Sequence, residues 1–427
     1  MTQEHQRQSA TKLLRHASQH FDLTDNEHQK QLLSLAEQLD SLALLSVEQL
    51  KQLAINEQAP LEFRLAVKLV DSKRYMRQIT KPISVGVVFA MWGEHNRLNP
   101  KSAHNPNGED SLRAKIDQLN WVTQDSPVSW RLYPIDDGCP HGSAEIARGI
   151  SITSESSKQV KVSCLEDYVA TGAGPLANLH SADDSRKGGA IILGCMKAVE
   201  NKVDVVVYTD ADNSVHLGQL GLLLRPYLEQ GKQVILGNRK HPDSILVKQE
   251  ERWGIGIKTL RHMQRMIGKQ IFSQGIKDTQ AAFKLYSRDA LTKILERPTV
   301  YDFSFDTDWI LAAMEYNKPI TTVPFAFIDS AAESASIVQG PMTTWFTLLE
   351  GLVKAARARQ ASYSREMATV FDEEIHSHKD LELLIDILPP ELEKATDANL
   401  GDPALMSPQK MREWIQRAKI SRPAAIS

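Results

Sequence analysis

The sequence predicts an α/β protein in which a mostly parallel sheet is flanked by helices, with helical extensions at both ends. One observation behind this is that short β-branched runs alternate with helical patterns between residues 81 and 335. Another is that leucines recur at helical spacing before residue 80, and that a helical pattern returns after residue 336. We therefore expect an N-terminal helical region (1–80), an α/β domain (81–335) and a C-terminal helical region (336–427).

The expected strands are runs rich in β-branched and aromatic residues that are bounded by polar residues or glycine. They are ISVGVVFAM, SWRLYPID, KQVKVSCL, DVVVYTD, QVILGN and ITTVPFAFID. The helical patterns between these runs would cover the sheet.

Composition restricts the class of protein. The chain of 427 residues exceeds the usual size of one domain, and 42% hydrophobic with 24% charged residues is typical of a soluble globular protein. A net charge of −3 argues against a nucleic-acid-binding surface. Cys139, Cys164 and Cys195 lack the paired spacing of a disulfide framework or a zinc site. The N-terminus is polar and the apolar runs are too short to span a membrane, so we expect a cytoplasmic protein.

The most informative motif is Asp210-Ala211-Asp212, which follows the run DVVVYT. Two carboxylates at the end of a buried strand add little to a core, but they suit Mg²⁺ or Mn²⁺, because hard cations take oxygen ligands and bridge to phosphates. Open α/β sheets also bind their ligands beyond the carboxyl ends of the strands. The motif therefore predicts a site for a metal and a nucleotide diphosphate. The alternative is an ordinary turn after a strand.

A second acidic pair, Asp136-Asp137, follows the run SWRLYPID and precedes Gly138. These carboxylates can accept hydrogen bonds from a base N–H and from ribose hydroxyls, while the glycine permits a tight turn. The alternative for this pair is an Asx-turn or a helix cap.

Basic residues follow two further elements. Lys187 and Gly189 open a helical pattern, where free backbone N–H groups and a cation can face phosphate or sugar oxygens. The segment is not a Walker A loop, because the upstream glycine and the Ser or Thr after the lysine are missing. Arg239 follows the run QVILGN, where it either clamps a phosphate or is a solvated loop cation.

The motifs of the chain resemble, in their order, those of inverting nucleotide-sugar glycosyltransferases with the GT-A fold, the family 2 type. They are FAMWGEHNRL, DDGC, RKGGA, DADNS, GNR, DTQAAFKLYSRDAL and FSFDTDWI. Within that family they are most similar to the polyprenyl-phosphate enzymes, especially dolichyl-phosphate glucosyltransferase and its mannosyl relative. The resemblance covers residues 83–330 and implies a Rossmann-like GT-A domain, a nucleotide-sugar donor and a divalent cation.

The resemblance also implies roles for residues on the donor side. Glu94 matches the carboxylate that closes the first motif. Asp136 and Asp137 match the acidic pair that binds the nucleoside, and Lys187 and Gly189 match the lysine–glycine segment near the donor.

Other matches concern the metal and the acceptor side. Asp210 and Asp212 match the metal and diphosphate motif, and Arg239 matches the basic residue after the next strand. Asp278 matches the aspartate that begins the segment on the acceptor side, and we count it among the candidate ligand-binding residues. The catalytic candidates match the acidic positions at the start of the following helix, where family members often carry Asp-x-Glu; they are Asp306 and Asp308.

Departures from the family pattern leave the substrates open. The first strand ends in AMWGE (90–94) where relatives usually have Pro-x-Tyr-Asn-Glu, and a polar insertion, NPKSAHNPNGED (99–110), follows it. Both changes lie beside the expected base pocket. The hydrophobic hairpin or tail of many lipid-phosphate relatives is missing, so the acceptor is a sugar, a small metabolite or a polyprenyl phosphate.

The resemblance implies transfer of a hexose with inversion, and the charges indicate that a metal assists it. A cation held by Asp212, with Asp210, stabilises the nucleoside diphosphate that leaves, with Lys187 or Arg239 as auxiliary cation. A hydroxyl acceptor needs a general base, for which Asp308 or Asp306 is placed. A phosphate acceptor needs none, because its second pKa of about 6 leaves it ionised at pH 7. The acidic pair then positions the acceptor or its cations. The alternative for this pair, or for one of its two residues, is an N-cap of the following helix.

We expect UDP-glucose as the donor, because DTQ-x-x-F-K-L and F-D-x-D look most like the glucosyl branch. A GDP-mannose-dependent polyprenyl-phosphate mannosyltransferase is the nearest alternative. A sugar nucleotidyltransferase would usually show a Gly-rich loop with Arg or Lys after the first strand, which FAMWGEHNRL lacks. A non-catalytic nucleotide-sugar-binding protein would lose the acidic residues that this chain keeps.

The segment 341–359, PMTTWFTLLEGLVKAARAR, predicts an amphipathic helix with a basic end. Trp345, Leu348, Leu349 and Leu352 fall on one face. We expect this face to pack on the sheet domain, with the basic end complementing the helix dipole. The alternative is a surface helix that lies on anionic lipid at the inner face of a membrane.

Overall fold

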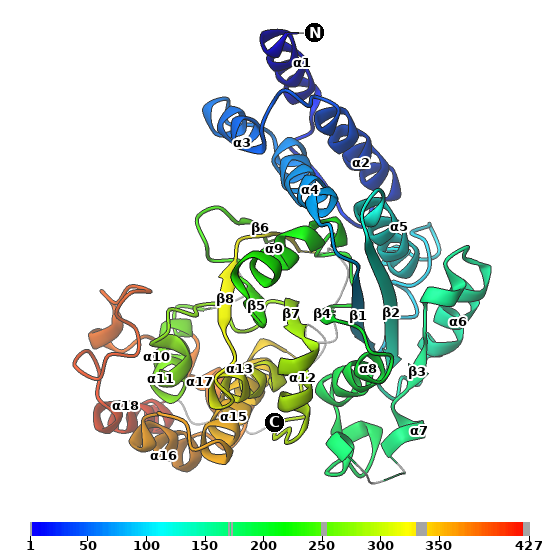
Figure 1. The fold of residues 1–427 in the computed structure, drawn as a ribbon. Helices are drawn as coiled ribbons and strands as arrows, with labels where there is room; N and C mark the ends of the chain where they lie inside the picture. Colours follow the sequence, from blue (N-terminus) through cyan, green and yellow to red (C-terminus); the bar gives the residue numbers. More distant parts are fainter. Residues whose placement is uncertain (1, 170, 172–173, 249–253, 330–339, 422–427) are drawn as a thin grey trace.

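The computed structural model describes residues 2–169, 171, 174–248, 254–329 and 340–421, and a seven-stranded sheet forms its centre (Figure 1). The strand order is β3-β2-β1-β4-β7-β5-β8, and every strand except β7 runs in the same direction. A two-stranded sheet pairs β6 with β9. The strands are β1 Ile83–Met91, β2 Val128–Asp136, β3 Ser163–Cys164, β4 Val205–Thr209, β5 Val234–Gly237, β6 Ile245–Val247, β7 Phe283–Ser287, β8 Ile320–Val323 and β9 Ala326–Ile328.

Helices cover both faces of the large sheet. Those of the first half are α1 Gln3–His16, α2 Asn26–Asp40, α3 Val47–Asn56, α4 Leu61–Gln78, α5 Ser111–Thr123, α6 Ser143–Thr153, α7 Glu166–Val169 and α8 Gly188–Glu200. Those of the second half are α9 Leu220–Gln230, α10 Ile257–Ile267, α11 Lys269–Phe272, α12 Arg288–Leu295, α13 Phe305–Glu315, α15 Pro341–Ala358, α16 Arg365–Glu374, α17 His378–Leu384 and α18 Pro408–Ser421. The predicted fold class, a mostly parallel sheet flanked by helices with helical extensions at both ends, is confirmed.

Most predicted strands form where the β-branched runs lie, and β1, β2, β4 and β5 differ from those runs only at their ends. The run KQVKVSCL contributes only the short β3. The run ITTVPFAFID is divided at Pro324 into β8 and β9, because proline has no N–H to donate to a strand ladder. Strand β7 lies in DTQAAFKLYSRDAL, where no strand is predicted, and it is the strand that runs antiparallel.

Alternate residues of each strand are buried on opposite faces of the sheet, as the two-residue period of a strand requires. On β4, Val206 and Tyr208 belong to one core, and Val205 and Val207 belong to the other. Helices α8, α10, α12, α13 and α15–α18 contribute to the first core, and α1–α5 and α9 contribute to the second.

The two helical flanks therefore extend different cores. Helix α4 packs against α9 and α5, and Figure 1 shows α1–α3 projecting from there beyond one end of the sheet. Helices α15–α18 gather beside α10 and α13 at the opposite end of the molecule (Figure 1). The expected boundary at residue 80 falls between α4 and β1, whereas the one at residue 335 lies outside the described residues.

The predicted amphipathic helix forms as α15, and its apolar face is buried. Trp345 and Leu348 are 7% and 8% exposed, and Leu349 and Leu352 are fully buried. They lie in the same core as α13 and α17, which is the expected packing on the protein rather than on lipid. Within the described residues, no helix combines the length and the apolar character that a membrane crossing needs.

Candidate active site

The carboxyl ends of β1, β2, β4 and β5 meet at one edge of the sheet, because these strands run in parallel. Glu94, Asp136, Asp210 and Arg239 lie at or just beyond these ends. Strand β7 runs the opposite way and begins at this edge, so that Asp278, which precedes it, lies there too. The sheet thus brings together motifs that are far apart in the sequence.

Asp210 and Lys187 form an ion pair at this edge. Nζ of Lys187 lies 2.5 Å from Oδ1 of Asp210, and both side chains keep 33% of their surface exposed. Burial raises the pKa of Asp210, but the Lys187 ammonium outweighs burial, so the pKa is lowered. Both groups are therefore charged at neutral pH, and Lys187 occupies one oxygen of the predicted metal motif.

The turn before α8 carries backbone strain. Arg186 and Lys187 have φ angles of +41° and +93°, in the left-handed region that favours glycine. The N–H of Lys187 donates to Oδ2 of Asp137 at 2.5 Å, and this bond helps to hold the turn. Strain of this kind concentrates at functional sites. Through Lys187, the acidic pair after β2 is linked to the metal motif after β4.

The glycines after Lys187 serve close packing. The N–H of Gly189 donates to the carbonyl oxygen of Tyr301 at 2.9 Å, so the predicted free N–H group is not available at this position. A Cβ on Gly188 would lie 2.4 Å from the same oxygen, and a Cβ on Gly189 would lie 2.7 Å from the side chain of Leu179. The start of α8 thus needs glycine at 188 because it lies against the backbone of residue 301, and at 189 because it lies against the side chains of Leu179 and Ser185.

The acidic pair Asp136-Asp137 is buried at the end of β2. Oδ1 of Asp136 accepts a hydrogen bond from the N–H of Cys139 at 2.9 Å. Asp136 thus has the role in a turn that was the alternative to nucleoside binding. Burial raises the pKa of Asp137 to about 6. Its Oδ1 has no hydrogen-bond partner within the described residues. Asp137 therefore keeps a buried acceptor atom that a ligand hydroxyl or N–H can use.

Asp212 is the other carboxylate of the metal motif. Its Oδ1 accepts from the N–H of Ser214 at 3.0 Å. Asp210 and Asp212 can offer oxygen ligands to a hard cation. In the part of the chain that the structure describes, no three His, Cys, Asp or Glu side chains are grouped so that they could hold a metal ion themselves. A cation at this motif would therefore need ligands beyond these side chains, and Mg²⁺ sites usually take them from water or phosphate.

Arg239 and Asp278 form a bidentate pair. Nε and Nη2 of Arg239 each lie 2.8 Å from an oxygen of Asp278, and the N–H of Arg239 donates to the same carboxylate at 2.9 Å. Burial raises the pKa of Asp278, but Arg239 outweighs it and brings the pKa to about 2. Asp278 therefore orients Arg239 at the strand ends, and its carboxylate is not free for a ligand.

The end of β1 places Glu94 and Trp92 beside the acidic pair. Glu94 is buried and lies 2.9 Å from Nη1 of Arg97. Burial raises the pKa of Glu94 to about 7, although Arg97 lowers it in part. Trp92 keeps 44% of its surface exposed, and its ring lies edge-on to that of His141 at 6.3 Å. The exposed Trp92 therefore lies at the end of β1, beside the position predicted for the base pocket.

Asp306 is buried beneath the site. Nζ of Lys284, from β7, lies 2.7 Å from Oδ1 of Asp306, and the two side chains are 0% and 2% exposed. Burial raises the pKa of Asp306 in spite of Lys284, and the charges of Lys187 and Asp210 also act on it. Asp306 therefore belongs to the same charge cluster as the metal motif.

Asp308 points to different partners. Its carboxylate accepts from the N–H of Thr299 at 2.9 Å, from Oγ1 of Thr299 at 2.6 Å and from Nε of Arg359 at 2.5 Å. It is fully buried, and it links α13 to the end of α15. Neither Asp306 nor Asp308 caps α13, whose N-cap residue is Ser304.

Several charged residues that contact the candidate residues were not predicted as site residues, although Arg97 lies in FAMWGEHNRL and Lys284 in DTQAAFKLYSRDAL. Lys115, Glu109 and Arg97 surround the 210–213 turn, and Lys284 and Arg359 neutralise the two acidic residues of α13. Lys284 is the lysine of DTQ-x-x-F-K-L, but nothing in that motif indicates that it pairs with Asp306. The others are ordinary charged residues until tertiary packing buries them.

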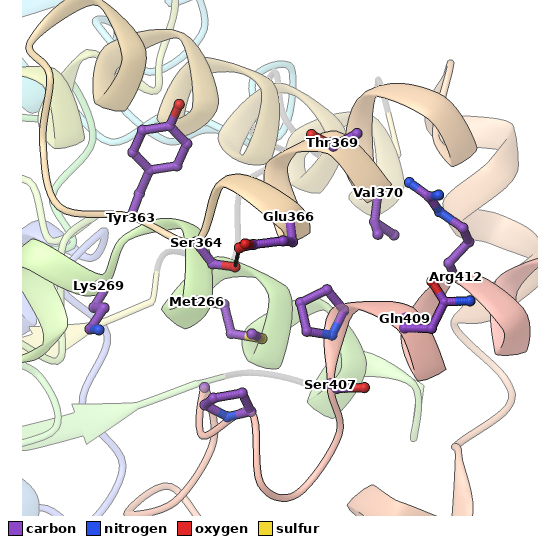
Figure 2. Close-up of a pocket in the computed structure, with 13 residues that line it drawn as sticks. Met266, Lys269, Tyr363, Ser364, Glu366, Thr369, Val370, Ser407, Gln409 and Arg412 are labelled. Atoms are coloured by element: carbon purple, nitrogen blue, oxygen red, sulfur yellow. Dashed lines mark hydrogen bonds between the residues drawn. The ribbon is translucent and has the colours of Figure 1, made fainter.

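A separate hollow of about 680 Å³ lies between α10, α11, α16 and the segment leading into α18 (Figure 2). Figure 2 shows Lys269 and Arg412 on opposite sides of it. Its lining comprises Met266, Lys269, Tyr363, Ser364, Glu366, Thr369, Val370, Gly401, Pro403, Ser407, Pro408, Gln409 and Arg412. None of these is a candidate site residue.

Comparison with known proteins agrees with the motifs. The chain is 26% identical over 152 residues to an undecaprenyl-phosphate mannosyltransferase of Micrococcus luteus, which covers 35% of this chain and 60% of that protein. It is 26% identical over 153 residues to a dolichyl-phosphate beta-glucosyltransferase of Trichomonas vaginalis, which covers 34% of this chain and 44% of that protein. The chain thus spans less than two thirds of the length of either relative. The similarity to polyprenyl-phosphate glycosyltransferases is confirmed, while no family model matches.

Solved structures show a more distant likeness. Mannosyl-3-phosphoglycerate synthase from Rubrobacter xylanophilus superposes with a TM-score of 0.45 at 13% identity, over 68% of this chain and 78% of that one. Glucosyl-3-phosphoglycerate synthase from Mycobacterium tuberculosis, in complex with Mn²⁺, uridine diphosphate and phosphoglyceric acid, superposes with a TM-score of 0.43 at 12% identity, over 70% and 84% of the two chains.

Proposed function

We propose that this relative of the polyprenyl-phosphate glycosyltransferases transfers a hexose from a nucleotide-diphosphate sugar to an acceptor, with inversion and with the help of a divalent cation. The observation that carries the proposal is the meeting of carboxylates and cations at one edge of the sheet. Asp137, Asp210 and Asp212 lie there with Lys187 and Arg239. This is the edge at which open α/β sheets bind nucleotides.

The donor would lie along this edge. Asp136 and Asp137 would bind the nucleoside, for which Asp137 has an unused buried acceptor atom. The exposed ring of Trp92 offers a flat surface to the base. Asp210 and Asp212 would hold the cation, Mg²⁺ or Mn²⁺, which supplies positive charge to the leaving diphosphate when bound. For this, Lys187 would exchange its contact with Asp210 for a phosphate oxygen.

The leaving diphosphate gains negative charge as the sugar–phosphate bond breaks, and fixed cations at that point stabilise the transition state. Arg239 is suited to this role, because Asp278 orients its guanidinium. The acceptor then attacks the anomeric carbon from the face opposite the diphosphate, so the configuration is inverted. UDP-glucose is the donor we expect, with GDP-mannose as the alternative.

The contacts of the acidic pair favour an acceptor that needs no general base. Asp308 is bound by three donors, and Asp306 is bound by the buried Lys284. A phosphate acceptor needs no general base, because its oxygen is already ionised at pH 7. In this proposal Asp306 and Lys284 shape the floor of the site, and Asp308 fixes α13 rather than acting as a base.

A phosphate-bearing acceptor also fits the charges beside Arg239. Burial lowers the pKa of Lys248, and the nearby Arg239 and Arg261 lower it further. Burial likewise lowers the pKa of Lys240, while Asp278 and Asp397 raise it in part and Arg261 and Arg265 lower it further. Lys240 and Lys248 thus add positive charge beside Arg239, although Asp278 lies near both of them, and this side of the site would suit a phosphate-bearing acceptor, whether a polyprenyl phosphate or a small metabolite.

A donor screen tests the proposal. Purified protein would be incubated with Mn²⁺ or Mg²⁺ and a panel of nucleotide sugars, and release of nucleoside diphosphate would be measured with and without phosphorylated acceptors. We expect turnover of UDP-glucose that EDTA abolishes. Turnover of GDP-mannose alone would establish the alternative donor. Formation of a nucleotide sugar from a nucleoside triphosphate and a sugar phosphate would instead identify a nucleotidyltransferase, and binding without turnover a non-catalytic protein.

A further inference from the structure

The 210–213 turn, which carries the predicted metal motif, is held by two side chains from another part of the chain. Nζ of Lys115, in α5, donates to the carbonyl oxygens of Ala211 and Asp212 at 3.1 Å and 2.5 Å. Oε2 of Glu109 accepts from the N–H of Asn213 at 2.8 Å. The amide of Asn213 donates back to the carbonyl oxygen of Glu109 at 2.9 Å. Lys115 thus holds the main-chain carbonyl groups of residues 211 and 212, and Glu109 holds the main-chain N–H of residue 213. Both sets of contacts lie next to Asp212 in the chain.

Packing alone does not explain a lysine in this place. Lys115 is fully buried, with its ammonium 5.6 Å from the centre of the Phe89 ring. A buried ammonium is costly unless polar partners compensate, and an apolar side chain would fill the same space without that cost. The partners of Lys115 are the two carbonyl groups of the turn, together with the charges of the surrounding carboxylates. The polar end of this lysine therefore serves the turn.

Glu109 is itself fixed in place. Its Oε1 lies 3.2 Å from Nε of Arg97, which also binds Glu94. Its N–H donates to the carbonyl oxygens of Arg97 and Asn99 at 3.2 Å and 3.1 Å. Glu109 is 1% exposed. A chain of contacts thus runs from the end of β1 to the metal motif after β4.

The insertion 99–110 builds this chain of contacts. The loop folds back on itself, so that the N–H of Asp110 donates to the carbonyl oxygen of Asn99 at 3.0 Å. A Cβ on Gly108 would lie 2.4 Å from the carbonyl oxygen of Pro100, and only glycine permits this close approach. The loop ends where α5 begins, and this junction supplies both Glu109 and Lys115 to the turn.

We propose that Lys115 and Glu109 are positioning residues that preorganise the 210–213 turn, so that the Asp212 carboxylate is held ready for the donor's divalent cation. This inference rests on the metal role given under the proposed function. It gives the 99–110 insertion a role in positioning the metal motif, in addition to its predicted place beside the base pocket. Partners that orient metal ligands typically change metal affinity about 10- to 100-fold when they are removed.

The test compares Mn²⁺ binding with turnover. Mn²⁺ would be titrated into protein saturated with UDP, with free Mn²⁺ followed by electron paramagnetic resonance, for the wild type, Lys115→Met and Glu109→Gln. We expect Mn²⁺ affinity to fall about 10- to 100-fold in both variants. The kcat at saturating Mn²⁺ should stay close to that of the wild type, because the carboxylate ligands remain. If Lys115 and Glu109 only stabilised the fold, Mn²⁺ affinity would not fall in folded protein while kcat stayed close to that of the wild type.

Lys73→Met is the matched control, because Lys73 is a buried lysine of α4 whose ammonium lies over the Trp121 ring at 4.2 Å, outside the site. Its Mn²⁺ affinity should equal that of the wild type. Wild-type affinity in Lys115→Met, or an equal loss in Lys73→Met, would overturn the proposal. If Lys115→Met does not fold, Glu109→Gln decides alone. A wild type that binds no Mn²⁺ would remove the metal role itself, and this proposal with it.

Discussion

Nε of Arg359 lies 2.5 Å from Oδ1 of Asp308, although the two residues are 51 positions apart in the sequence. The side chains are 1% and 0% exposed. Arg359 also donates to Glu315 and to the carbonyl oxygen of Arg297, both at 2.8 Å. This buried network attaches the C-terminal helices to α13, which carries the acidic pair. The C-terminal region therefore supports the site structurally.

Arg359→Met should destabilise the protein, because Asp308 would remain buried without its cation. Breaking a buried ion pair on one side costs about 3–5 kcal/mol, and urea unfolding would measure it. Arg357→Met is the control, since Arg357 pairs with Asp372 on the surface, and such exposed pairs contribute about 0–1 kcal/mol. Equal stability of the two variants would contradict the anchoring role of Arg359.

Asp308→Asn and Asp306→Asn should each reduce kcat by less than about 10²-fold in protein that remains folded, because the proposed phosphate acceptor needs no base. Loss of a true general base costs about 10²–10⁴-fold. Transfer to a polyprenyl phosphate and to hydroxyl acceptors would be compared for both variants. A 10²–10⁴-fold loss of kcat in Asp306→Asn, but not in Asp308→Asn, would identify a hydroxyl acceptor with Asp306 as its base.

Asp212→Asn should abolish transfer and leave the melting temperature nearly unchanged, because this partly exposed carboxylate has little packing role. Activity would be measured across a Mn²⁺ titration and in EDTA. Asp243→Asn removes a carboxylate that is 78% exposed and outside the site, so it should behave as the wild type. Equal wild-type activity in EDTA and in Mn²⁺ would contradict the metal role.

Donor use should depend on pH through Asp137. Burial raises the pKa of this carboxyl to about 6, and only the ionised form offers both oxygens as acceptors. The kcat/KM for the donor should therefore fall as the pH decreases through about 6, and it should be steady above that value. Asp137→Asn should lower kcat/KM and remove this acid limb. An unchanged limb in the variant would show that another group, such as Glu94, titrates there.

Trp345→Ala should affect stability rather than membrane contact. The indole is 7% exposed within the core, and removing a large buried side chain costs about 3–5 kcal/mol. Co-sedimentation with anionic vesicles at low salt should be the same for the folded variant and the wild type. Salt-sensitive binding that Trp345→Ala abolishes in folded protein would restore the lipid-surface alternative for α15.

Much of the site could be predicted because two local signals coincide in the sequence. β-branched runs marked β1, β2, β4 and β5, and polar residues marked the points where these strands end. Parallel strands place their carboxyl ends at a common edge, so Asp137, Asp210 and Arg239 had to converge once the sheet was assumed. Strand β7 was not predicted, because its five residues are all buried, and so short a segment with a lysine in it does not show which secondary structure it forms.

The sequence by itself determined most of the parallel strands and the residues that follow them at the carboxyl edge, because hydrophobic period and turn composition are properties of neighbouring residues. Only the tertiary structure decided which charges pair. Lys115 reaches the 210–213 turn, Lys284 reaches Asp306 and Arg359 reaches Asp308 across long stretches of chain. A charge needs a specific partner only when it leaves water, and which charges are buried depends on how distant elements pack.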